Sequence, residues 1–151
     1  MTKNQQYTDS VGTDSYPDDR GVPLDDFFID SRGEIKNLLL SSFTSVARIE
    51  SKLGTVRANH YHLTDWHYAY IERGAVLYFE RAIGEKNIPT PVKYAEGAMF
   101  FTPPMVEHAM VFPTDTVIYT FAKNKRSHEE HEADLKRVDF ITPSILADLL
   151  K

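Results

Sequence analysis

The chain contains six histidines, and four of them are spaced so that their side chains could meet: His60, His62, His67 and His108. His60 and His62 are separated by one residue on a predicted strand, so both side chains point to the same face. His67 follows the turn-like residues 63–65, and His108 opens a later strand. Two antiparallel strands and a distant third can bring three or four imidazoles together inside a barrel. Imidazole is a ligand that suits zinc, copper, iron and nickel.

A metal centre has to be weighed against an ordinary structural role. A single histidine on a strand is usually exposed or hydrogen-bonded rather than a ligand. Four histidines on one inferred face favour a metal site, and a site that keeps an open position is typical of catalysis. The other two, His128 and His131, lie in the densely charged run 123–134, which is predicted to be an exposed loop.

The spacing around the first three histidines resembles the first motif of the cupin superfamily, G-x5-H-x-H-x3/4-E-x6-G. Gly54, His60, His62 and Gly74 stand at the matching positions, and His67 replaces the usual glutamate.

The second cupin motif, G-x5-P-x-G-x2-H-x3-N, is matched by Gly97, Pro103 and His108. Met105 replaces its second glycine and Phe112 its asparagine. This resemblance implies an all-β fold, a double-stranded β-helix or jelly-roll barrel of the RmlC-like type.

The resemblance also implies one divalent transition metal, which would be held by the four matching residues: His60, His62, His67 and His108. A fourth imidazole in place of a carboxylate leaves the full +2 charge on the ion and strengthens its action as a Lewis acid. The expected metals are therefore zinc, nickel, iron, manganese or copper, whose identity the sequence leaves open.

A shorter stretch upstream, Asp30-Ser31-Arg32-Gly33, resembles the opening of cupins that isomerise or epimerise nucleotide sugars. In some of those enzymes paired histidines act as acid and base without a metal. The resemblance therefore keeps open a metal-free role for His60 and His62. The same four residues also fit a plain turn.

Short stretches rich in β-branched and aromatic residues alternate with turn signals from Leu24 onward, which is typical of an all-β barrel. Arg73-Gly74 indicates a tight hairpin, and Thr142-Pro143 predicts the start of a short C-terminal helix over 144–150. The predicted strands cover residues 35–40, 45–51, 58–62, 66–72, 75–81, 98–102, 107–112 and 117–122.

Strand alternation also predicts which side chains surround the histidines. Trp66, Tyr68 and Tyr70 should face the opposite side, where packing or a dimer contact is favoured over substrate stacking. Glu72 and Arg81 are further polar candidates for the site. The predicted substrate pocket comprises Val56, Ala58, Met99, Phe101, Met110, Phe112 and Tyr119.

The 151 residues suit one domain, and the absence of cysteine excludes disulfides and thiolate zinc sites. Residues 1–30 carry seven aspartates and two basic residues, which accounts for the net charge of −5. We expect a polar acidic arm at 1–23, a single cupin domain at 24–151 and a homodimer. No basic face, long apolar run or signal-peptide pattern is visible, so we expect a cytoplasmic protein that binds neither nucleic acid nor membranes.

Three hypotheses about function follow. The first is a metal-dependent enzyme that acts on a small polar molecule, such as a sugar, by isomerase, epimerase, lyase or dioxygenase chemistry. The second is a cupin that binds a small molecule without catalysis. The third is a metal-free nucleotide-sugar isomerase in which His60 and His62 transfer protons. The four-histidine pattern favours an enzyme with a metal.

Overall fold

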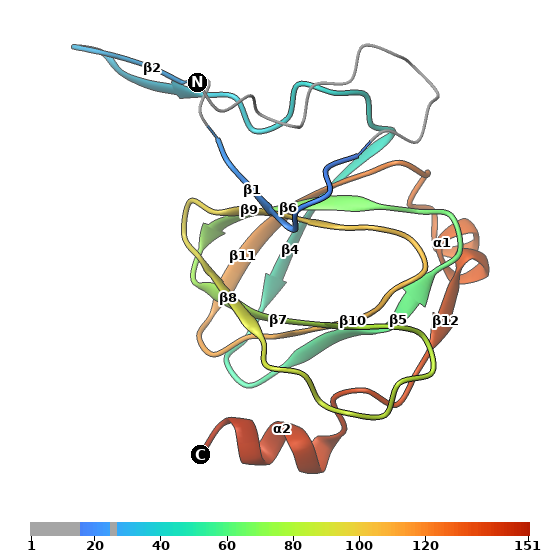
Figure 1. Ribbon diagram of the computed structural model, residues 1–151. Helices are drawn as coiled ribbons and strands as arrows, with labels where there is room; N and C mark the ends of the chain where they lie inside the picture. Colours follow the sequence, from blue (N-terminus) through green and yellow to red (C-terminus); the bar gives the residue numbers. More distant parts are fainter. Residues whose placement is uncertain (1–15, 25–26) are drawn as a thin grey trace.

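Two five-stranded antiparallel sheets face each other and form a barrel (Figure 1). The computed structural model describes residues 16–24 and 27–151. The strands are β1 (Gly21–Val22), β2 (Phe27–Asp30), β3 (Gly33–Lys36), β4 (Ser45–Ser51), β5 (Val56–His62), β6 (His67–Arg73), β7 (Ala75–Arg81), β8 (Val92–Ala95), β9 (Met99–Thr102), β10 (Glu107–Val111), β11 (Thr116–Ala122) and β12 (Leu135–Arg137). The helices are α1 (His128–Asp134) and α2 (Pro143–Leu149).

The strand order shows how the chain winds. One sheet has the order β1-β9-β6-β11-β4 and the other the order β12-β5-β10-β7-β8. From β4 to β11 the chain changes sheet at every connection except β7 to β8, as a jelly roll does. The predicted all-β jelly-roll barrel with a short C-terminal helix is confirmed.

The Arg73-Gly74 pair is not the hairpin that the sequence predicts, because β6 and β7 belong to different sheets. It is a sharp corner that carries the chain across the barrel. Gly74 has a φ of 93°, and a Cβ there would lie 2.5 Å from the carbonyl oxygen of Asp115. Only glycine combines this conformation with so close an approach.

Several predicted elements match the structure to the residue or nearly so. β4 and β7 have the expected bounds, and α2 follows Thr142, whose hydroxyl accepts a hydrogen bond from the backbone N–H of Ile145. The sequence analysis missed β1, β2, β8, β12 and α1, which are short or strongly charged.

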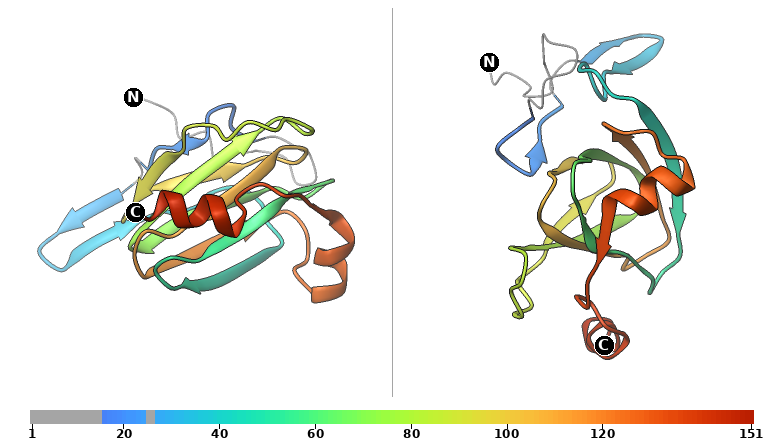
Figure 2. Two further views of the ribbon diagram at one scale, coloured as in Figure 1. Left: turned by 90° about the horizontal axis from the view of Figure 1, so that it is seen from below. Right: turned by 90° about the vertical axis from the view of Figure 1, so that its right-hand side faces the viewer.

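The interior of the barrel holds one apolar cluster, and its outer faces carry two others. The interior cluster includes Ile71, Tyr78, Phe100 and Ile118. On one outer face, Trp66, Tyr68 and Tyr70 pack with the aliphatic side chains around them, as strand alternation predicted. On the other face, α2 covers its own cluster, which includes Phe79, Phe140 and Ile141 (Figure 2).

The described part of the predicted N-terminal arm packs on the barrel. Tyr16 stacks on Phe101 with ring centroids 5.1 Å apart. The Nε and Nη2 atoms of Arg20 donate bidentate hydrogen bonds of 2.9 to 3.1 Å to the Glu80 carboxylate. The first 15 residues of the predicted arm lie outside the described residues. None of the helices in the described ranges is long and apolar enough to cross a membrane.

The hairpin formed by β2 and β3 projects away from the barrel (Figures 1 and 2). The stretch that resembles nucleotide-sugar cupins forms its tip, where the Asp30 carboxylate accepts hydrogen bonds from the backbone and guanidinium of Arg32. In this chain the stretch is therefore a turn that lies outside the barrel.

Candidate functional site

Three histidines from two neighbouring strands converge inside the barrel. His60 and His62 lie on β5, and His108 lies opposite His60 on β10. The ring centroid of His60 is 4.7 Å from that of His62 and 4.8 Å from that of His108. One nitrogen from each ring lies within 4.8 Å of the others. This spacing allows three imidazoles to share one ion.

His67 reaches the same space from β6, in the opposite sheet. Its ring centroid lies 6.2 Å from His62 and 5.9 Å from His108, further than the three rings lie from one another. Its Nε2 atom is buried and has no hydrogen-bond partner among the described residues. His67 is therefore the fourth histidine of this cluster and the one that lies furthest from the other three.

A β-bulge in β5 turns His60 toward the interior. Ala58 and Asn59 have positive φ angles of 73° and 54°, and the register with β10 shifts at this point. The Asn59 side chain stabilises the bulge, because it donates to the carbonyl oxygen of Ile141 and accepts from its N–H. Bulges of this kind re-aim side chains beside functional sites.

The histidines are neutral and lack partners for one nitrogen each. Burial lowers the pKa of His60 to about 2 and the pKa of His62 and His108 to about 4, and it lowers the pKa of His67 well below its usual value. Four ring nitrogens, one from each histidine, are buried without a hydrogen-bond partner in the described chain. Buried polar atoms normally have partners, so these nitrogens are free to bind a shared ligand such as a metal ion.

Neighbouring groups lie beside two of the rings. Nδ1 of His108 lies 3.2 Å from the carbonyl oxygen of Val106, so it carries the proton and leaves Nε2 with a free lone pair. Nδ1 of His62, which makes no hydrogen bond, lies 3.5 Å from the Asp134 carboxylate and would be attracted to it if protonated. Backbone carbonyls and carboxylates orient metal-binding histidines in the same way.

His131 also reaches this site, contrary to the prediction of an exposed loop. Its ring centroid lies 5.5 Å from that of His62 and 6.4 Å from that of His60. Residues 128–134 form helix α1 rather than a loop, and His131 is partly buried on it. His128, on the same helix, is exposed. Ser127 followed by Glu130 is a helix-start signal that the sequence analysis passed over.

Helix α1 is fastened over the site at its C-terminal end. The Asp134 carboxylate accepts hydrogen bonds from the Thr64 N–H, the Thr64 hydroxyl and the Asp65 N–H, at 3.0, 2.7 and 2.9 Å. The Leu63 N–H donates to the Asp134 carbonyl oxygen. The loop between β5 and β6 thus fixes the helix that carries His131.

The histidines open into a cavity of about 380 Å³. Strands of both sheets, β12 among them, and helix α1 contribute to its lining. It is lined by Ile49, Val56, Arg57, Ala58, His60, His62, His67, His108, Met110, Thr120, Arg126, His131, Glu132, Leu135 and Arg137.

Comparisons with known proteins bear on the fold. The sequence matches no protein-family model and no curated protein. The structure is similar to that of the 3,4-ketoisomerase QdtA from Thermoanaerobacterium thermosaccharolyticum in complex with TDP, with a TM-score of 0.60, 18% identity and coverage of 85% of this chain and 91% of that chain.

Two epimerases are similar as well. The dTDP-4-dehydrorhamnose 3,5-epimerase from Sulfolobus tokodaii has a TM-score of 0.58 and 15% identity, over 80% of each chain. NovW, a 4-keto-6-deoxy sugar epimerase from Streptomyces spheroides, has a TM-score of 0.61 and 13% identity, over 83% of this chain and 71% of that chain. The chain has an RmlC-like cupin fold.

The wall of the cavity differs in part from the predicted substrate pocket. Val56, Ala58 and Met110 line it, but Met99, Phe101, Phe112 and Tyr119 do not. Phe101 lies opposite Tyr68 and Met99 opposite Tyr70, so both share the outer face of those aromatic side chains.

Tyr119 also lies opposite Tyr70 and faces outward, which leaves its neighbour Thr120 on the cavity wall. Phe112 packs in the interior apolar cluster. The pairing of β9 and β11 with β6 decides which of their residues point inward.

The polar candidates Glu72 and Arg81 lie away from the cavity lining. Glu72 is exposed near the end of β6. Arg81 is buried and donates to Glu107 at 2.8 Å, and its guanidinium lies 3.9 Å from the centre of the Phe140 ring. The other Glu107 oxygen accepts the Gly84 N–H at 2.9 Å. This ion pair stabilises the cupin barrel.

Replacing Glu107 by glutamine is expected to lower the free energy of unfolding by about 3–5 kcal/mol, because Arg81 would then be a buried charge without a counter-ion. Chemical denaturation with urea measures the change. Glu72→Gln, an exposed site on β6, is the control and should stay within about 0.5 kcal/mol of wild type. Equal stability of the two variants would contradict a stabilising role of the buried pair.

Proposed function

We propose that this chain is a metal-dependent enzyme that moves a proton next to a carbonyl group of a small sugar-like molecule. The observation that carries the proposal is the convergence of four neutral, buried imidazoles, each with one unpartnered nitrogen, on one cavity. His60, His62 and His108 would hold the ion, with His67 as the fourth ligand. A bound divalent ion supplies Lewis-acid polarisation of a carbonyl oxygen.

The protein's own residues provide the rest of the chemistry. Burial, followed by the charge of Arg126, lowers the pKa of His131, so its imidazole is neutral near pH 7 and can accept a proton. His131 lines the cavity beside His62, with ring centroids 5.5 Å apart. Ile49, Val56 and Met110 give that cavity an apolar part of its lining, against which a carbon skeleton could pack.

The structural neighbours support the choice of reaction. They are sugar ketoisomerases and epimerases, and one was solved with TDP-4-keto-6-deoxyglucose. The same neighbours support a second candidate, a metal-free isomerase of nucleotide sugars in which His60 and His62 act as acid and base. Several of those structures contain TDP.

One experiment separates the two candidates. Protein purified without a histidine tag near pH 7.5 is analysed for metals, then incubated in D₂O with TDP-4-keto-6-deoxyglucose while mass spectrometry follows deuterium uptake. About one zinc, nickel or manganese per chain, together with uptake abolished by a chelator, supports the metal-dependent proposal. Iron or copper would favour oxygen chemistry instead. No metal even after soaking, with chelator-resistant uptake, would favour the metal-free candidate.

We also propose that the chain forms a homodimer through the β2–β3 hairpin. Phe28 and Ile35 lie opposite each other on one face, and Phe27 and Ile29 share the other face. These four side chains are 52–63% exposed, and the barrel covers neither face. An exposed apolar surface of this kind marks a contact site.

The double variant Phe28→Ser and Ile35→Ser is expected to be monomeric, because it removes one apolar face of the hairpin. Light scattering measures the mass of each protein. Val92→Ser, which removes an apolar side chain of similar exposure (52%) on β8, is the control and should remain dimeric. A monomeric wild-type protein would contradict the proposal.

A further inference from the structure

The cavity wall carries more positive than negative charge. Its arginines are Arg57, Arg126 and Arg137, and Glu132 is its one acidic residue. Arg137 donates to both Glu132 oxygens at 2.8 Å, so these two charges neutralise each other. Two guanidinium groups are left over, beside a centre proposed to hold a divalent cation. A cavity of this composition attracts anions.

Arg126 is one of these two guanidinium groups, and it lines the cavity. It donates no hydrogen bond to any residue in the described part of the chain, although it lies in the segment that α1 fastens over the site. After burial, its positive charge is among the further causes that lower the pKa of His62, His67 and His131. Asp65, the acidic side chain that attracts it, already accepts a hydrogen bond from the Asn124 N–H.

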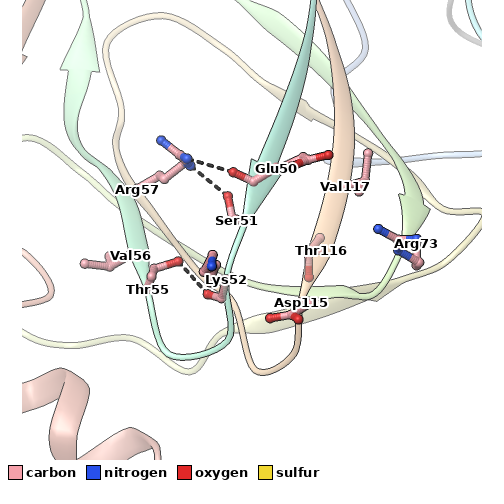
Figure 3. A pocket seen from close by; sticks show the side chains of 10 residues that line it. All are labelled: Glu50, Ser51, Lys52, Thr55, Val56, Arg57, Arg73, Asp115, Thr116 and Val117. Atoms are coloured by element: carbon pink, nitrogen blue, oxygen red, sulfur yellow. Dashed lines mark hydrogen bonds between the residues drawn. The ribbon is translucent and has the colours of Figure 1, made fainter.

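Arg57 is held in place from the other side of the cavity. Its Nε donates to the Ser51 hydroxyl at 2.7 Å, and its Nη2 donates to the Glu50 carbonyl oxygen at 2.8 Å. Arg57 also lines a second cavity, of about 590 Å³. Figure 3 shows this cavity and both hydrogen bonds of Arg57. The Nη1 donors make no hydrogen bond to described residues. These two bonds restrain the exposed Arg57 side chain and leave its Nη1 donors for a ligand.

The two free guanidiniums repel each other. After burial, the charge of Arg57 is a further cause of the lowered pKa of Arg126. Two like charges beside one cavity are unfavourable, and an anion between them would remove the repulsion. Guanidinium groups bind carboxylate and phosphate oxygens in pairs of short, charge-assisted hydrogen bonds.

We propose that the cavity binds an oxyanion, a carboxylate or phosphate group, between Arg126 and Arg57. The substrate class, which rests on the proposed function, is then a small carbonyl compound that carries an anionic group. Arg126 and Arg57 hold the anionic end, and the carbonyl end faces the histidines. Arg126 acts as a substrate-binding residue on the segment that covers the site.

The test is a calorimetric titration of the protein as purified, at pH 7.5 and low salt. Malonate and inorganic phosphate are the probes, in separate titrations. At least one should bind to wild type, and the probe that binds identifies the anion as carboxylate or phosphate. Arg126→Gln should weaken that binding roughly 10- to 100-fold, since a charge-assisted hydrogen bond is lost.

The matched control is Lys125→Gln, which removes a positive charge one residue away on an exposed side chain that does not line this cavity. It should stay within about twofold of wild type, because the Lys125 side chain does not line the cavity and water screens its charge from a ligand there. Wild type that binds neither probe, or Arg126→Gln that binds as well as wild type, would overturn the inference.

Metal analysis of the same samples keeps the two proposals apart. Arg126→Gln should retain the wild-type metal content, because Arg126 is not a ligand. Weakened anion binding with normal metal supports the inference. A metal-free wild type would refute the metal centre, and the anion titrations would still decide the inference on their own.

Discussion

Replacing His60 or His62 by alanine is expected to abolish retention of the divalent metal while the barrel stays folded. Loss of groups that merely orient a metal ligand already costs about 10- to 100-fold in affinity, so loss of a ligand should cost at least 100-fold. The fold should survive, since these imidazoles have a buried, unpartnered nitrogen and contribute little to stability without metal. Elemental analysis measures metal content, and circular dichroism measures the fold.

The control for this experiment is His128→Ala, because His128 is exposed on the same helix as His131 and does not line the cavity. It should keep a full complement of metal. Stoichiometric metal in His60→Ala or His62→Ala would refute the histidine centre.

A second variant examines the most distant ligand. His67→Glu restores the residue type that the cupin motif usually has at this position and should keep metal binding. Complete loss of metal from this variant would show that His67 does not occupy the position of the motif glutamate.

The metal-free protein is expected to lose stability steeply as the pH falls below 6.5. The pKa of His60 is lowered to about 2 and the pKa of His62 and His108 to about 4, while unfolded histidines titrate near 6.5. The unfolded chain therefore takes up protons first. Each buried imidazole costs about 1.4 kcal/mol of unfolding free energy per pH unit between those two values.

One buried carboxyl acts in the opposite direction. Burial raises the pKa of Asp65 to about 6, so below that pH the folded protein takes up a proton that the unfolded chain does not. This proton uptake offsets part of the loss of stability caused by one buried imidazole. His67 adds to the loss of stability, because burial also lowers its pKa. The net loss between pH 6.5 and 5.5 should be roughly 3 kcal/mol, because unfolded histidines are about half protonated at pH 6.5 and about nine-tenths protonated at pH 5.5.

Urea denaturation of the metal-free protein at pH 7.5, 6.5 and 5.5 measures this loss. His60→Gln should reduce the slope by about one proton, because glutamine does not titrate, and His128→Ala should leave the slope unchanged. A flat profile from pH 7.5 to 5.5 would mean that the histidines are not held neutral by burial.

The barrel and its histidine strands could be predicted from the sequence for physical reasons that act locally. Alternation along β4 and β7 fixed their bounds, since side chains on a strand point to opposite faces. The histidine spacings match motifs of a superfamily whose fold the structure confirms. Thr142 and Pro143 start α2, because capping depends only on residues at the start of the helix.

Other features depend on contacts between residues far apart in the chain. The pairing of β9 and β11 with β6 decided that Met99, Phe101 and Tyr119 face away from the cavity, and no pattern within those strands contains that register. The bulge at Ala58 and Asn59 depends on hydrogen bonds between Asn59 and Ile141, 82 residues away.

The same distinction explains the mouth of the cavity. The charged run 123–134 looks exposed in sequence because nearly all of its residues are charged or polar. Asp134 fastens it to the loop at residues 63–65, and this long-range contact brings His131 and Arg126 over the histidines. The sequence by itself thus determined the barrel and the buried imidazoles, through local alternation and spacing. Only the tertiary structure decided which charged side chains surround them, because that depends on where distant segments meet.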